Sequence, residues 1–300
     1  MFEDAIEKVG NFTRPVFSIM RTYGSAKILP SSSTLFFVNE EGFAVTTKGT
    51  AKMIMDASAI EEKYLKFKEA KKQLLQQAEA EAADTALEEL LKSLEKEYEY
   101  EENTITQMKI RFVDCVDALS GIQCRFHPKA DVAILKLDGF NQINYSGYAT
   151  FAAEEQEIRQ GKFLCRLGFP FPEFTNYMYD AQRDEIAWTN EGNRTSPRFP
   201  SEGMVTRFIG ADNQIAGIEM STPGFTGQNG GPLFDAKGIV YGMQSSTGSL
   251  SFGHCVHADV IKQFLEKEEV QYYTDSNQPS IKLEPLDLSY IIAKNTGKLQ

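Results

Sequence analysis

The sequence predicts a mainly β protein whose strands are interrupted by one long helical segment. Short segments rich in Val, Ile and Phe recur between turn signals such as Asn39-Glu40-Glu41-Gly42 and Ala236-Lys237-Gly238, a rhythm typical of antiparallel strands in a barrel or sandwich. Between Gly49 and Gly121 there is neither glycine nor proline, whereas every other stretch of similar length contains them. Such a gap indicates long, uninterrupted helices.

The expected strands, in chain order, are 15–20, 34–38, 43–47, 104–113, 122–126, 132–137, 163–167, 204–209, 215–220, 239–243 and 252–256. A closing helix is expected at Ala258–Glu268, because its apolar residues Val260, Ile261, Phe264 and Leu265 fall on one face. The tail from Gln271 is polar, with a late apolar stretch at 288–293.

The interrupting segment reads as a hairpin of two helices. Its first helix carries small or apolar residues in alternating steps of four and three, as in a coiled coil: Met53, Ala57, Ile60, Tyr64, Phe67, Leu74 and Ala78. Thr85-x-x-Glu88 is a capping box that predicts the start of the second helix, whose apolar stripe is Leu87, Leu90, Leu91, Leu94 and Tyr98. Two helices with a short connection are expected to pack antiparallel.

Composition and charge exclude several classes of protein. The 300 residues carry a net charge of −11, which disfavours generic binding to nucleic acid, and no apolar run is long enough to cross a membrane. The start of the chain lacks the basic and apolar stretches of a signal peptide. The four cysteines are too few to staple the chain and read as reduced thiols, so a cytoplasmic protein is expected.

Three segments bear the marks of a known family when they are taken in order. They are Thr34–Gly49, Asp131-Val-Ala-Ile-Leu-Lys-Leu137, and Ser221–Phe234 with its Gly-Gly-Pro-Leu sequence, which is followed by Asp235–Gly242. Their order and spacing resemble the trypsin-like serine proteases, especially the bacterial HtrA-like branch. Cys165–Pro170 is similar to that branch's strand and turn after the acid, and the first nine residues resemble its N-terminal helix.

The resemblance implies a two-barrel trypsin-like fold built from residues 1–50 and 104–270. The helical hairpin at 51–103 is then an insertion, and residues 271–300 form a C-terminal tail. Relatives often carry a peptide-binding PDZ domain after the protease, but too few residues follow the closing helix here for a second domain of that type.

The catalytic positions that the resemblance implies are degenerate. Gly49 occupies the position of the catalytic histidine, Asn229 occupies that of the serine, and only Asp131 matches the acid. A triad needs an oxygen nucleophile, a base and an acid, and neither glycine nor a carboxamide can replace the first two. No histidine precedes His127, and no serine lies between Ser221 and Ser245.

Plainer interpretations exist for the same residues. Asp131 can simply cap the start of a strand or accept backbone hydrogen bonds, which is the role we favour. Asn229 can be a turn residue, since Asn tolerates left-handed backbone geometry, and Gly49 can end a strand. His127 is expected in a surface loop, and His254 and His257 along a strand near the surface. No metal site and no cofactor is expected.

The remaining parts of the family's site depend on backbone shape. By resemblance, the N–H groups of Gly227 and Asn229 match the oxyanion hole. The strand around Tyr241–Ser246 matches the edge on which substrate pairs, so the groove residues expected to receive an extended peptide are Pro223, Tyr241, Gln244, Ser245 and Ser246.

The sequence therefore predicts a catalytically inactive trypsin-like homologue that acts as a peptide- or protein-binding module. Two alternatives stay open, namely an active serine-type hydrolase with a non-standard site and a structural protein that assembles through its helical hairpin. From Asp56 to Glu102 there are fourteen acidic residues and seven lysines, which give the hairpin a net charge of −7. The hairpin is also the element through which oligomerisation is expected. Its charge suits a basic partner or simply keeps the chain in solution.

Overall fold

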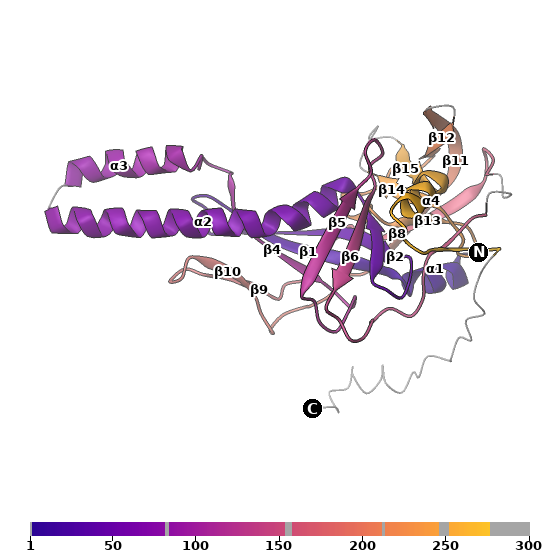
Figure 1. Ribbon diagram of the computed structural model, residues 1–300, viewed down its shortest axis with the longest axis horizontal. Coiled ribbons are helices and arrows are strands. Elements are labelled where there is room, and N and C mark those ends of the chain that lie inside the picture. Colours follow the sequence, from indigo (N-terminus) through magenta and orange to yellow (C-terminus); the bar gives the residue numbers. More distant parts are fainter. Residues whose placement is uncertain (1, 82–83, 154–157, 212–213, 246–251, 277–300) are drawn as a thin grey trace, which may run out of the picture.

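Two β-sheets form the body of the molecule, and a helical hairpin projects from one end of it (Figure 1). This is a computed structural model that describes residues 2–81, 84–153, 158–211, 214–245 and 252–276. The short helix α1 (Glu3–Gly10) precedes the first strand and buries Ala5 and Val9.

The first sheet has six strands in the order β4-β1-β2-β3-β6-β5. Their bounds are β1 Thr13–Thr22, β2 Ile28–Phe37, β3 Phe43–Thr46, β4 Ile105–Phe112, β5 Gly121–Phe126 and β6 Ala133–Asp138. All pairings are antiparallel. The two outer strands, β4 and β5, are not paired with each other, so this sheet is an open barrel.

The second sheet has eight strands in the order β13-β8-β11-β12-β15-β14-β7-β16, and a further pairing of β13 with β14 closes its first six strands into a barrel. Their bounds are β7 Thr150–Phe151, β8 Phe163–Gly168, β11 Phe199–Ala211, β12 Gln214–Met220, β13 Pro232–Phe234, β14 Val240–Ser245, β15 Gly253–His257 and β16 Tyr273–Thr274. The turn η1 (Thr226–Gln228) precedes β13, and α4 (Ala258–Lys267) follows β15.

One continuous hydrophobic core joins the two sheets. Phe36, Phe37 and Ile134 of the first sheet belong to the same buried cluster as Phe234 and Val240 of the second. The amphipathic helix α4 adds Ile261, Phe264 and Leu265 to that cluster. The two sheets are therefore held together by burial of apolar surface, which fixes the segments that meet between them.

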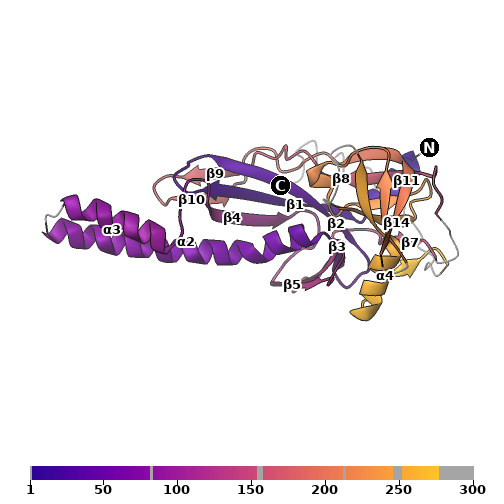
Figure 2. The same ribbon diagram turned by 90° about the horizontal axis from the view of Figure 1, so that it is seen from above.

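The hairpin consists of α2 (Lys48–Glu81) and α3 (Asp84–Glu97). The first turns of α2 place Ala51 and Ile54 in the main core, and the helix then lies along β4 before it leaves the body (Figure 2). Where the arm leaves, Tyr64, Phe67, Leu94 and Tyr100 form a separate buried cluster. At 1.5 Å per residue, the 34 residues of α2 extend for about 50 Å.

A polar cluster fastens α2 to the body at the base of the arm. The β9–β10 ribbon (Tyr177–Asp180 and Glu185–Trp188) turns at Asp184, which forms an ion pair of 2.7 Å with the buried Arg21 of β1. The hydroxyls of Tyr64 and Tyr179 both donate to the Asp184 carboxylate. Gln107 of β4 accepts from Arg21 Nε and donates to the Asp184 carbonyl, so three parts of the chain meet here.

The predicted fold class is confirmed. The protein is mainly β, with an inserted antiparallel helical hairpin and a C-terminal helix, and the paired barrels are consistent with the two-barrel trypsin-like fold. The first inserted helix begins at Lys48, so it already contains Gly49, and the second begins at Asp84. Leu90, placed on the buried stripe of α3, is exposed instead. Within the described residues, no helix combines the length and the apolar character needed to span a membrane.

Candidate functional site

Gly49, Asp131 and Asn229, which occupy the catalytic positions implied by the resemblance, lie where the two barrels meet. Gly49 is the second residue of α2, and a Cβ atom built on it has no neighbouring atom within 4 Å, apart from its own helix and adjacent residues. Gly49 therefore lies in the first turn of the inserted helix and does not simply end a strand. No close contact requires a glycine at this position.

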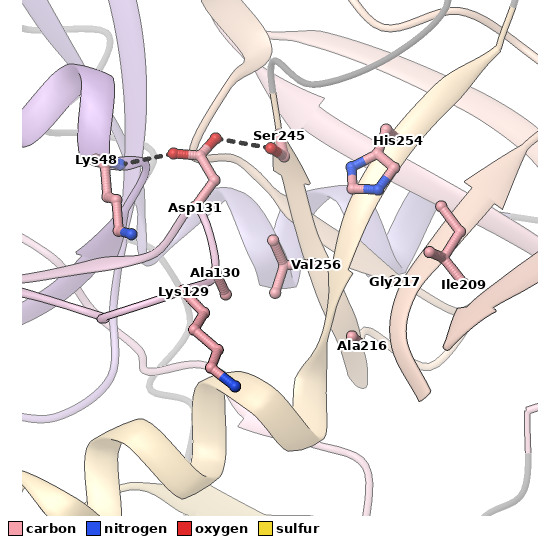
Figure 3. Close-up of a pocket in the computed structure, with 10 residues that line it drawn as sticks. All are labelled: Lys48, Lys129, Ala130, Asp131, Ile209, Ala216, Gly217, Ser245, His254 and Val256. Atoms are coloured by element: carbon pink, nitrogen blue, oxygen red, sulfur yellow. Dashed lines mark hydrogen bonds between the residues drawn. The ribbon is translucent and has the colours of Figure 1, made fainter. Parts of the chain in front are cut away.

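Asp131, just before β6, uses both of its carboxylate oxygens. Oδ1 accepts a 3.0 Å hydrogen bond from the backbone N–H of Lys48, and Oδ2 accepts one of 2.7 Å from the hydroxyl of Ser245 (Figure 3). The first bond satisfies an N–H at the start of α2 that has no partner within the helix. Asp131 thus accepts a backbone hydrogen bond, as its plainer interpretation expected, although the group it caps is a helix rather than a strand.

Asn229, at the position of the nucleophile, is 9% exposed and has φ −58° and ψ 129°. Its carbonyl accepts a hydrogen bond from Thr34 N, and its own N–H donates to Thr226 O at 3.0 Å. The left-handed position of this turn is Gly230, with φ +88°, so the expectation that Asn229 supplies left-handed geometry is wrong. The glycine is needed there because a Cβ would lie 2.1 Å from the carbonyl oxygen of Thr34.

Of the predicted oxyanion-hole pair, the N–H group of Asn229 is already engaged in this conformation. The Asn229 N–H already donates to Thr226 O within the turn η1, so it does not face the cleft as a free donor. Gly227 is buried, its carbonyl accepts a 2.7 Å bond from Thr34 Oγ1, and a Cβ atom here would lie 2.5 Å from Phe169 O and Pro170 Cα. The Asn229 N–H is thus used within the turn, and the Gly227 backbone is packed tightly against Thr34 and Phe169.

The predicted peptide edge is also largely occupied. From Gly242 to Gln244, β14 pairs with β15 on one side and with β13 or the preceding turn on the other. The Gln244 N–H donates to Gly231 O, and its carbonyl accepts from Gly230 N. The expectation that this part of β14 is an open edge is therefore wrong, because the barrel closes over it.

The other groove residues are spread around this strand. Pro223 is exposed on the loop before η1, Tyr241 and Gln244 are buried, and Ser245 is 2% exposed at the end of β14. Ser246 lies outside the described residues.

A cleft of about 400 Å³ opens beside Asp131. Its wall includes Lys48, Lys129, Ser245 and His254, and apolar residues such as Ile209 and Val256 also line it (Figure 3). His254 is the cross-strand neighbour of Ser245, so their side chains lie on one face of the sheet. Burial lowers the pKa of His254, against the opposing charges of Glu219 and Asp131.

The chemistry of this cleft differs from that of a hydrolytic triad. In a triad, the imidazole stands between the acid and the hydroxyl, so that it removes the hydroxyl proton. Here Asp131 holds the Ser245 hydroxyl directly, and Ser245 is almost completely buried. Asp131, Ser245 and His254 therefore share a cleft, but the imidazole does not stand between the acid and the hydroxyl, and the hydroxyl is not exposed as nucleophilic attack requires.

The other two histidines have local structural roles. His127 Nδ1 accepts hydrogen bonds from the N–H groups of Lys129 and Ala130 and so closes a turn, and its ring packs against Phe264. His257 Nδ1 accepts from Asp259 N and caps α4. Among the residues that the structure describes, no group of three His, Cys, Asp or Glu side chains is arranged to hold a metal ion.

Two features near η1 were missed by reasoning from the sequence. Phe171, Phe199 and Phe225 pack edge to face or tilted, with ring centroids 5.2–5.8 Å apart, although Phe171 is 39% and Phe225 41% exposed. We refer to these three residues as the aromatic patch. Arg166 of β8, in contrast, is fully buried. The signal for Arg166 was a charged residue in the middle of the apolar strand Phe163-Leu-Cys-Arg-Leu167.

Comparisons with known proteins give similarities to solved structures only. No family model matches the chain, and no curated protein matches it. Among solved structures, the chain is similar to one described as "HtrA-type protease AlgWS227A with tripeptide", with 14% sequence identity and a TM-score of 0.48. The similarity covers 89% of this chain and 63% of that one, so this chain spans less than two thirds of that protease's length.

Proposed function

We propose that this protein is a catalytically silent relative of the trypsin-like serine proteases that binds a peptide or protein partner without cleaving it. The observation that carries the proposal is the state of Asp131. Both of its oxygens are engaged, by Lys48 N and by Ser245 Oγ, so the carboxylate orients a helix end and a buried hydroxyl rather than an imidazole.

The environment of Asn229 supports the same proposal. Its carboxamide is a poor nucleophile, and its N–H is bonded within the turn. In a related triad, loss of the nucleophile or the base alone lowers turnover on the order of a million-fold. A chain that lacks both and has no free oxyanion donor at Asn229 has little basis for acyl transfer.

The aromatic patch supports binding. Its three phenylalanines, of which Phe171 and Phe225 are exposed and Phe199 is half-buried, form an apolar surface beside the turn η1. Exposed aromatic clusters of this kind are characteristic of protein interaction sites. Phe225 lies in the chain just before η1, so a ligand on the patch also touches the loop that carries Asn229.

Cleavage is tested by incubating the pure protein with a broad peptide library and analysing the products by mass spectrometry. We expect no cleavage above that of a buffer control. Reproducible cleavage that disappears on Ser245→Ala or Asp131→Asn would contradict the silent assignment and favour a non-standard hydrolase.

Binding is tested with the same library displayed on beads. We expect a subset of peptides to be retained by the wild-type protein and released by Phe225→Ser. The matched control is Phe163→Ser, a phenylalanine 56% exposed at the other end of β8. If no peptide is retained, or if both variants bind equally, the aromatic patch is not the binding surface.

A second candidate function is assembly through the arm. The observation that favours it is the exposure of Leu65 and Leu75 on α2 and of Leu90 on α3, on an element held rigidly at its base. A hairpin with unburied leucines is suited to pack against another helical surface.

A further inference from the structure

Arg166 is the most deeply buried charged group of the second barrel. It lies in the middle of β8, is 0% exposed, and sends its guanidinium toward the loop before η1. Nη1 donates to Gln244 Oε1 at 2.9 Å. Nη2 lies within 2.7–3.1 Å of three oxygens, which are Thr222 O, Thr222 Oγ1 and Pro223 O.

This guanidinium has no counter-charge. All four acceptors are neutral, and in the described part of the chain no carboxylate forms an ion pair with it. Its Nε is also buried and has no hydrogen-bond partner among the residues that the structure describes. Burying a charge is costly unless it is paired and fully hydrogen-bonded, so an anion that reaches Arg166 gains an unusually strong partner.

The half-buried Arg14 shows how a purely structural guanidinium is satisfied in this fold. Arg14 also contacts only neutral acceptors, but all three of its nitrogens donate, to the carbonyls of Gly10, Thr13, Asp114 and Asn144. Arg166 differs because its Nε, which shares one edge of the planar guanidinium with Nη2, donates to no acceptor in the described residues. That edge can donate two parallel hydrogen bonds to the two oxygens of a carboxylate.

Only a thin layer separates this edge from solvent. The acceptors at Nη2 belong to the loop 221–226, in which Ser221, Pro223, Phe225 and Thr226 are exposed and the others half-buried. Gly253 lies close behind the guanidinium, since a Cβ atom there would be 2.1 Å from Nη1. The covering segment is thus one loop deep, and on its Gly224 side the Gln244 amide packs against it, since a Cβ atom on Gly224 would lie 2.1 Å from Gln244 Nε2.

The aromatic patch adjoins the same loop, because Phe225 follows Gly224 directly. An apolar surface beside a buried cation fits a ligand that carries a carboxylate next to an apolar side chain.

We infer that Arg166 is the anchor for a carboxylate of the bound peptide, which reaches the Nε–Nη2 edge beneath the loop 221–226 while a neighbouring apolar residue lies on the aromatic patch. The inference rests on the proposed peptide-binding function and assigns its ligand class. The carboxylate belongs either to an Asp or Glu side chain or to the C-terminus of the partner, and both offer the same two oxygens.

The test uses four bead libraries of eight-residue peptides and the full-length protein. The libraries combine a free or an amidated C-terminus with either a fixed central Glu or a fixed central Gln. We expect binding to the libraries with a carboxylate to exceed that to the amide/Gln library by about tenfold, as charge-assisted hydrogen bonds of ordinary strength imply. The Glu arm and the free-terminus arm identify the source of the carboxylate.

The variant Arg166→Met is expected to lose this preference, and Arg14→Met is the matched control that retains it. If no library binds at all, the proposed function fails. If peptides bind equally with and without a carboxylate, or if folded Arg166→Met keeps the preference, peptide binding stands and the assignment of Arg166 is overturned.

A second measurement covers the case in which Arg166→Met does not fold. The wild-type protein, labelled with ¹⁵N-arginine, is titrated with one carboxylate peptide and its amide/Gln counterpart while the arginine Nε–H resonances are recorded. The resonance that Arg166→Lys removes is expected to shift with the carboxylate peptide only. A shift that is equal for both peptides, or no shift with either, contradicts the inference.

Discussion

The guanidinium of Arg21 forms an ion pair of 2.7 Å with Asp184, although 163 residues separate them in the chain. Arg21 is buried, whereas a third of the Asp184 side chain stays exposed. This pair, with the Tyr64 hydroxyl that also donates to Asp184, connects the sheet, the β9–β10 ribbon and the base of the arm. It is the clearest case in the molecule of a charge that holds distant elements together.

Asp184→Asn is expected to lower the free energy of unfolding by about 2 kcal/mol, because it leaves Arg21 buried without its counter-charge. Asn keeps the left-handed conformation of this position, φ +49°, so the loss reports the charge rather than the backbone. Urea titration at pH 7 measures the difference. Glu62→Gln, which breaks an exposed ion pair with Lys66, is the control and should change stability little.

The same carboxylate predicts a dependence on pH. Burial alone would raise the pKa of Asp184, but hydrogen bonds from Tyr64 and Tyr179 and the charge of Arg21 outweigh it and lower that pKa. The stabilisation is therefore complete above the ordinary pKa of an aspartate and is lost as the pH falls through the lowered value. Melting temperatures between pH 6 and pH 3 should decline less steeply for Asp184→Asn than for the wild type.

His257 predicts a separate effect near neutral pH. Burial lowers its pKa against the attraction of Asp259, with Lys262 acting in the same direction as burial. Stability is then complete above the pKa of an unfolded histidine and falls as the pH decreases toward the lowered value. His257→Asn keeps a side-chain acceptor at the N-terminus of α4 and is expected to reduce the loss of stability between pH 7.5 and pH 5.5. An unchanged loss in this variant would assign the effect to other groups.

Two glycines of the candidate site, Gly227 and Gly49, are expected to respond in opposite directions to alanine. Gly227→Ala places a Cβ atom 2.5 Å from backbone atoms of Phe169 and Pro170, so it should cost about 3 kcal/mol of stability. Gly49→Ala meets open space at the start of α2 and should be neutral or stabilise by about 0.5 kcal/mol. Thermal unfolding of the two variants distinguishes the packed turn at Gly227 from the open space at Gly49.

The arm is expected to be dispensable for folding of the body. Removal of Leu75–Leu91, with a short glycine connection, keeps the buried cluster of Tyr64, Phe67, Leu94 and Tyr100 intact. We expect less than about 1 kcal/mol of change in the stability of the body, measured by urea titration, because surface elements of this kind contribute little. Sedimentation of the shortened and full-length chains compares their oligomeric states; identical states would exclude the arm as the assembly element.

Local patterns of the sequence predicted much of the fold. The absence of Gly and Pro between Gly49 and Gly121 located the helical insertion, because helix interiors exclude these residues. Alternating apolar segments located most strands, since each of them buries one face in a barrel. The sheet order itself, including the opening between β4 and β5, depends on contacts between segments far apart in the chain.

The candidate site was predicted only in part. Motif spacing identified Asp131 and Asn229, and the structure places them at the junction of the barrels. The partners of these residues were not predictable, because Ser245 is 114 residues from Asp131 and Thr34 is far from the turn that it holds. The engaged Asn229 N–H is a property of one backbone conformation, which side-chain identity does not specify.

The helix α2 has a mechanical consequence. Its first residue, Lys48, is tied to Asp131 at the cleft, and its middle is fastened through Tyr64 to Asp184, while its far half stands free of the body with α3 (Figure 1). A load on the far half of the arm acts on a stiff rod with a fulcrum at Tyr64. The contacts of Tyr64 and the Arg21–Asp184 pair lie between that load and the cleft, so they are the first to resist it.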